Sequence, residues 1–136
     1  MRLVVDTNII FSALIKNSTT RGILLSTKFD FFTPEYVFIE IQNHSIEVMK
    51  KSKYCLEEFE TMVDTLFSNI MVVPSEDFKD FIPRAYQIMS DIDEDDTSFL
   101  ALAFMINGNG IWSNDPHFEK QNVVKVWRTK DMINLL

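Results

Sequence analysis

Short apolar segments separated by helical segments constrain the fold of this chain more than any other sequence feature. Residues 3–5 form a wholly apolar run, as expected of a central parallel strand that is buried on both faces. Strands that alternate with helices form parallel sheets covered by helices on both sides. The other strands are predicted at residues 31–32, 70–73, 111–112 and 123–127.

Helices are predicted between these strands. Thr33 is expected to cap a long helix that begins at Pro34, because Thr suits the N-cap and Pro the first helical position. Pro83 lies near the middle of another predicted helix and is expected to kink it or split it into two. The predicted helices span residues 8–15, 20–29, 34–51, 56–68, 77–89, 99–106 and 129–136.

Length and charge limit the number of domains and the classes of function that are open to this chain. The chain has 136 residues, of which 46% are hydrophobic, so it can form one core and is predicted to be a single domain over residues 1–136. The net charge of −7 argues against a protein that coats polyanions, because such proteins neutralise phosphates with Lys and Arg. An enzyme of nucleic acids stays open, since a divalent ion inverts the field of an acidic site.

Cysteine content and hydropathy indicate the compartment. Cys55 is the only cysteine, so the chain cannot form an internal disulfide or a thiolate zinc site alone. The N-terminal apolar run is interrupted at Asp6, and no stretch approaches the ~18 apolar residues of a membrane span. A soluble, cytoplasmic protein with no membrane partner is expected.

Four acidic residues lie where apolar segments begin or end: Asp6, Glu40, Asp96 and Asp115. A carboxylate in such a position is costly to desolvate unless it has a hydrogen-bond partner or a cation. Asp6 and Asp115 each follow a predicted strand, and ligands of parallel sheets bind beyond the carboxyl ends of the strands. These positions suggest one metal site at that edge of the sheet.

Each acidic residue also has an ordinary structural explanation. Asp6 could equally be the cap of the following helix, although Thr7 or Asn8 could cap it instead. Glu40 could extend to solvent, and Asp115, which precedes a proline, could be a turn residue. Asp96 is favoured within the acidic run over residues 91–96 because it lies three residues before Phe99, but the sequence does not exclude three other acids of the run: Asp93, Glu94 and Asp95.

Other polar residues give weaker signals. His44 shares a helix face with Glu40, and His117 follows Asp115, but both are better explained as partly solvated histidines. No glycine-rich phosphate loop is present. The candidates for contact with a nucleic-acid backbone are three lysines in a predicted turn, namely Lys50, Lys51 and Lys53.

Together these segments resemble the PIN-domain family, which includes toxin ribonucleases of the VapC type. The matching segments are LVVDTNIIFSAL, PEYVFIEI, DEDDTSFLALA and IWSNDPHF, in that order along the chain. The resemblance implies a three-layer α/β/α sandwich with a central, mostly parallel five-stranded sheet. It also implies that Asp6, Glu40, Asp96 and Asp115 bind one or two Mg²⁺ or Mn²⁺ ions, supported by Thr7 and Ser113.

The implied function is a metal-dependent ribonuclease, with the toxin of a toxin–antitoxin pair as one form that it could take. Hydrolysis of RNA, an antitoxin protein partner and a homodimer are therefore expected. An interface of the dimer could use apolar residues of the first two helices, including Phe11, Ile23, Leu24 and Leu25.

Competing functions are of three kinds. A haloacid-dehalogenase-type phosphatase needs a second acid two residues after Asp6, where this chain has Asn8. A receiver-like regulatory domain needs an acid after the third strand, where this chain has Pro74. A catalytically silent PIN-like module that binds a protein or RNA partner is the serious alternative, although the presence of all four acids argues against it.

Overall fold

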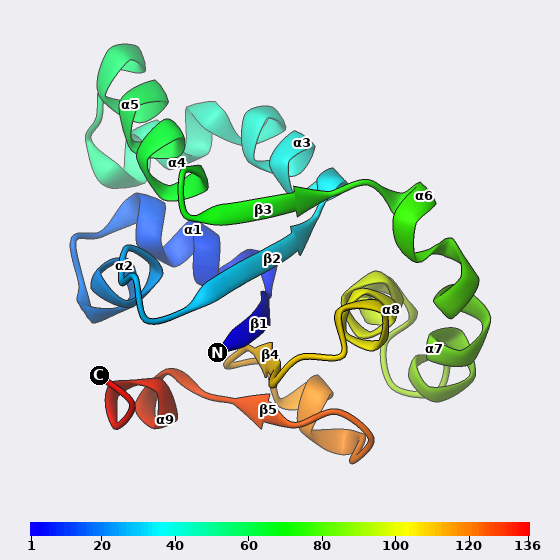
Figure 1. Ribbon diagram of the computed structural model, residues 1–136. Helices are drawn as coiled ribbons and strands as arrows, with labels where there is room; N and C mark the ends of the chain where they lie inside the picture. Colours follow the sequence, from blue (N-terminus) through cyan, green and yellow to red (C-terminus); the bar gives the residue numbers. More distant parts are fainter.

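Five parallel strands form the central sheet (Figure 1). The computed structural model describes all residues from Met1 to Leu136. The spatial order is β3-β2-β1-β4-β5, and every pairing is parallel, which confirms the predicted α/β fold. The strands are β1 (Arg2–Val5), β2 (Asp30–Pro34), β3 (Ile70–Val73), β4 (Gly110–Trp112) and β5 (Val126–Trp127).

The strand order reverses between β1 and β4. The chain builds outward from β1 to β2 and β3, and then returns to the other side of β1 for β4 and β5. In open parallel sheets such a switch point leaves a crevice at the carboxyl ends of the two strands. The topology therefore directs attention to the residues that follow β1 and β4.

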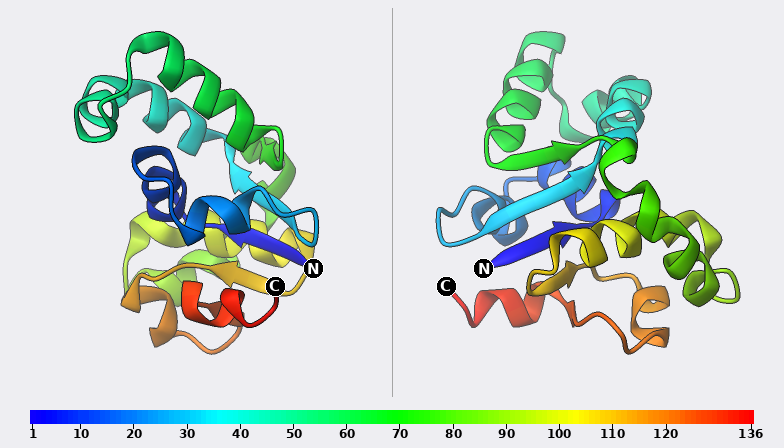
Figure 2. Two further views of the ribbon diagram at one scale, coloured as in Figure 1. Left: turned by 90° about the vertical axis from the view of Figure 1, so that its left-hand side faces the viewer. Right: turned by 45° about the vertical axis from the view of Figure 1, so that its right-hand side comes forward.

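Helices cover both sides of the sheet (Figures 1 and 2). Helix α8 packs on β1, β2 and β4, with α6 and α7 packed against it, while α1 contacts α2, α4 and α5. Helices α4 and α5 form an arm that extends away from the sheet in Figure 2. The helices are α1 (Thr7–Ile15), α2 (Thr19–Leu24), α3 (Glu35–Asn43), α4 (Ser45–Ser52), α5 (Leu56–Phe67), α6 (Ser75–Phe78), α7 (Ile82–Met89), α8 (Thr97–Ile106) and α9 (Thr129–Ile133), with short 3-10 helices η1 (Lys79–Phe81), η2 (Glu94–Asp96) and η3 (Pro116–Lys120).

The core is one cluster of 33 buried hydrophobic residues. Helix α8 is apolar on nearly all sides because it lies between the sheet and the helices α6 and α7. Ile23 and Leu24 are fully buried in this core, so they are not available to the dimer interface that the sequence suggested. Of the four apolar residues named for that interface, Leu25 is exposed and Phe11 is half-buried.

The predicted helix over residues 34–51 is wrong in two respects. It is divided at His44, whose backbone angles (φ −103°, ψ 17°) are not helical, into α3 and α4. Its start is also shifted, because Pro34 ends β2 and caps α3. Thr33 does not cap the helix; its hydroxyl instead donates a hydrogen bond to the carbonyl of Val5, 3.1 Å away, and so ties β2 to β1.

Other helices and strands also begin or end at residues that differ from the predicted ones. The predicted helix over residues 77–89 is split into α6, η1 and α7, with Pro83 in the second position of α7, where its missing N–H costs nothing. Helix α2 ends at Leu24, whose carbonyl accepts a hydrogen bond from the Asn69 amide. Strand β5 begins at Val126 because the Gln121 side chain accepts hydrogen bonds from the preceding backbone at Val123 and Val124. No helix is both long and apolar enough to cross a membrane.

Candidate metal centre

Asp6 and Asp115 meet at the switch point of the sheet. Asp6 follows β1 directly, caps α1 and accepts a hydrogen bond from the backbone N–H of Asn8 at 2.8 Å. Its other carboxylate oxygen accepts a hydrogen bond from the buried hydroxyl of Ser113. The same hydroxyl accepts a bond from the backbone N–H of Asp115 at 2.9 Å. The helix cap and the candidate site therefore use one side chain, and neither Thr7 nor Asn8 takes over the cap.

All four predicted acids line one cavity of about 410 Å³. Asp96 reaches it as the N-cap residue of α8, and Glu40 reaches it from α3. Thr7 also lines the cavity, whereas Ser113 lies behind it and holds Asp6 and Asp115. The remaining lining residues are Asn8, Tyr36, Asp95 and Phe99.

The cavity places negative charge where it is poorly solvated. Burial, followed by the charges of Asp93, Asp115 and Asp6, raises the pKa of Asp96 to about 7. Burial also raises the pKa of Asp6, although the hydrogen bonds from Ser113 and Asn8 oppose that change. The Asp96 Oδ2 atom is buried and has no hydrogen-bond partner. This unpartnered oxygen and the all-oxygen donor set fit a hard divalent cation such as Mg²⁺ or Mn²⁺.

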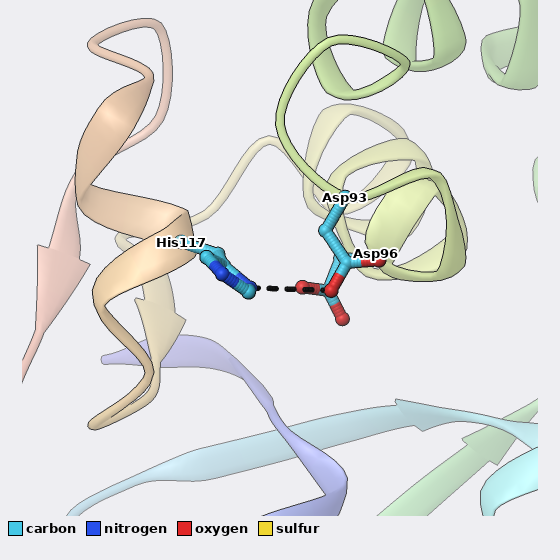
Figure 3. A group of neighbouring side chains, drawn as sticks. All are labelled: Asp93, Asp96 and His117. Atoms are coloured by element: carbon cyan, nitrogen blue, oxygen red, sulfur yellow. Dashed lines mark ion pairs between the residues drawn. The ribbon is translucent and has the colours of Figure 1, made fainter.

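His117 and Asp93 lie beside Asp96 (Figure 3). The His117 Nδ1 atom lies 3.2 Å from Asp93 Oδ2 and 3.5 Å from Asp115 Oδ1. One ligand atom from each of Asp93, Asp96 and His117 lies within 4.8 Å of the others, so these residues could also hold an ion. His117 was expected to be an ordinary, partly solvated histidine. It joins the site because Asp115 accepts a hydrogen bond from its backbone N–H and thereby fixes the start of η3.

Tyr36 is a lining residue that the sequence did not single out. It precedes Glu40 by one helical turn, so both side chains lie on the same face of α3. Burial raises the pKa of Tyr36, and the nearby charges of Glu40, Asp96 and Asp6 raise it further. The phenol is therefore a neutral hydrogen-bond donor at the wall of the cavity, and its ring packs edge-on against Phe99.

His44 and the three lysines lie apart from this cavity. His44 packs against Phe11 with ring centroids 5.9 Å apart and lines a separate groove between α1 and α4. Lys51 forms an ion pair with Glu47 at 3.0 Å, which reduces its value as a phosphate contact. Lys50 and Lys53 are exposed at the end of α4, on the arm.

Divalent-ion binding to this cavity is expected to depend on pH. Asp96 must lose its proton before it can bind a cation, and burial keeps that proton in place up to about pH 7. The affinity for Mn²⁺ should therefore rise as the pH increases through about 7 and level off above it. Calorimetric titrations between pH 5.5 and 8.5 test this expectation, because this range extends about one to two units to either side of that pKa. Affinity that does not change across this range would contradict it.

Comparisons with known proteins bear on the family and on the fold. The family model of the PIN domain matches residues 4–136. The comparison with curated proteins gave no match. A solved structure of VapBC2 from Rickettsia felis, bound to a DNA fragment from their promoter, is similar over 94% of this chain and 98% of that chain, with a TM-score of 0.71 and 17% identity. At this identity the structural similarity establishes a shared fold.

Proposed function

Because the chain belongs to the PIN domain family, we propose that it is a metal-dependent ribonuclease that hydrolyses RNA phosphodiester bonds. The observation that carries this proposal is the convergence of four carboxylates, from four separate segments of the chain, on one cavity. Burial, together with this concentration of acids, destabilises the metal-free protein, as the raised pKa of Asp96 indicates. A bound cation neutralises these negative charges and attracts a phosphate.

Asp6, Asp96, Asp115 and Glu40 would hold one or two Mg²⁺ or Mn²⁺ ions. When bound, such an ion activates water as a nucleophile and stabilises the charge that develops on the phosphate. Ser113 keeps the carboxylate of Asp6 and the backbone of Asp115 in fixed positions. Asn8 supplies a second hydrogen bond to Asp6, so the carboxylate cannot turn away from the cavity.

The test is cleavage of an end-labelled structured RNA by the wild type and by Asp96→Asn. We expect cleavage by the wild type with Mg²⁺ or Mn²⁺, none with EDTA, and a loss of more than about 100-fold in the variant. Circular dichroism should show that the variant is folded. If the wild type cleaves no RNA and calorimetry detects no Mn²⁺ binding, the protein is better explained as a catalytically silent module that binds a partner.

A protein partner and self-association are part of the same proposal. The solved structure that shares this fold is that of VapBC2 bound to a promoter DNA fragment, which supports the role of a VapC-type toxin with an antitoxin partner. Two large apolar side chains are exposed on the arm, Ile46 at 69% and Leu56 at 58%, and could be covered by a second copy or by a partner. Sedimentation of the isolated chain, with and without a co-expressed candidate antitoxin, separates these possibilities.

A further inference from the structure

We propose that a second pocket, at the opposite end of β4 from the acids, binds a phosphate group of the RNA backbone. This inference rests on the proposed nuclease function. The pocket has a volume of about 290 Å³ and lies between α7, the end of α8 and the segment before β5. Its polar lining includes Arg84, Asn107, Asn109 and Lys125.

The charge of this pocket differs from that of the whole chain. Acidic residues outnumber basic ones by 20 to 13 in the sequence, yet no Asp or Glu lines the pocket. Arg84 and Lys125 both line it, and neither forms an ion pair with a carboxylate. Two residues that line the pocket therefore carry positive charges that are not paired with a carboxylate.

Aromatic rings hold both cations in place. The Arg84 guanidinium carbon lies 4.1 Å from the centroid of the Phe104 ring, and the Lys125 Nζ atom lies 3.9 Å from the Trp127 ring. A cation over an aromatic face is restrained by the ring without losing its N–H donors to a carboxylate. A stacked guanidinium in particular keeps N–H groups at its edge that can bind a phosphate in a bidentate manner.

The loop between α8 and β4 is fixed closely against its neighbours. A Cβ atom at Gly108 would lie 2.6 Å from the Arg2 carbonyl oxygen, and one at Gly110, where φ is +128°, would lie 2.2 Å from the Lys125 carbonyl oxygen. The indole N–H of Trp127 donates to the carbonyl of Asn109 at 2.8 Å. This wall of the pocket is therefore built in advance, which lowers the entropic cost of binding.

The negative end of α8 does not oppose an anion here as strongly as a bare helix end would. The Arg2 Nη1 atom donates a hydrogen bond to the carbonyl of Ile106 at 3.1 Å, so a positive charge already lies at that end. Lys51 on the arm is a poorer candidate, because it is paired with Glu47. Strand β4 has three residues and so spans about 10 Å, with the pocket at its start and the acids beyond its end.

Salt-dependent RNA binding tests the proposal. The Asp96→Asn protein, which should bind RNA without cutting it, is compared with the same protein that also carries Arg84→Gln and Lys125→Gln. The matched control carries Lys50→Gln and Lys53→Gln, which remove the same charge from the arm. The plot of log K against log salt has a negative slope. We expect the size of this slope to decrease by about 0.7 in the protein with Arg84→Gln and Lys125→Gln, because one phosphate contact is lost, and to stay the same in the control.

Titration with inorganic phosphate gives an independent reading by nuclear magnetic resonance. The backbone amide signals of Gly108 and Gly110 should shift saturably, and the shifts should disappear in the Arg84→Gln, Lys125→Gln variant. Cleavage of RNA by the wild type, together with an unchanged salt slope in that variant, would overturn the phosphate-binding role of the pocket. The proposed nuclease function would then still stand. Phosphate-dependent shifts without any RNA binding would overturn the RNA assignment and the nuclease together, and would leave a pocket for a free nucleotide.

Discussion

Asp96→Asn is expected to stabilise the metal-free protein at pH 8, although the same change is expected to abolish the proposed cleavage of RNA. Folding raises the pKa of this carboxyl from 3.8 to about 7, so at pH 8 the folded state holds a charge that the unfolded state holds more cheaply. The full shift would be worth about 4 kcal/mol. Because the side chain is only half-buried, solvent screening reduces the expected gain to about 1–2 kcal/mol.

The sign of the effect follows from the proton balance. Between about pH 4 and pH 7 the folded protein binds a proton at Asp96 more tightly than the unfolded chain does. The free energy of unfolding of the wild type therefore falls as the pH rises through this window, relative to that of the variant. The two proteins should differ little at pH 4 and most above pH 7.

Urea unfolding in EDTA across this pH range measures the difference, with Asp91→Asn as the control. Asp91 belongs to the same acidic run but is exposed and does not line the cavity, so its replacement should change stability by no more than about 0.5 kcal/mol. Saturating Mn²⁺ should reverse the order, because only the wild type then gains binding free energy. Equal stability of wild type and Asp96→Asn in EDTA at pH 8 would show that the charged Asp96 carboxylate does not destabilise the folded protein.

The strands were predictable because their signal is local. A run such as residues 3–5 is apolar on both faces of a strand, and only a doubly covered sheet buries it. The break at His44 was not predictable, because neither Gly nor Pro marks it and the apolar spacing of Val37, Ile41 and Val48 continues across it. It arises because α3 packs on β2 and β3, whereas α4 packs on α1.

The candidate site was predictable where chain position alone determines it. Asp6 and Asp115 could be assigned to the same edge because each follows a strand of a parallel sheet. His117 could not be assigned, since its place depends on a contact with Asp93, 24 positions earlier in the chain, at 3.2 Å. Tyr36 was overlooked although it shares a helix face with Glu40, a signal that the spacing contained.

Ser113→Ala is expected to weaken Mn²⁺ binding by about 10- to 100-fold, even though the hydroxyl is no ligand. The Ser113 hydroxyl is fully buried, donates to Asp6 and accepts from the backbone N–H of Asp115. Its removal frees one oxygen of Asp6 and leaves the partly buried N–H of Asp115 without its partner. The second defect should also lower the free energy of unfolding by about 1–3 kcal/mol.

Asn114→Ala is the matched control for Ser113→Ala. Asn114 is the next residue in the same turn, and its side chain bonds to Thr129 rather than to any acid. Both variants should lose stability, but only Ser113→Ala should lose metal affinity beyond what its stability explains. Calorimetric Mn²⁺ titration of the two folded proteins at pH 8 separates the effects. Equal affinities would mean that Asp6 keeps its position without Ser113, so that the cap bond from Asn8 alone would have to orient the carboxylate.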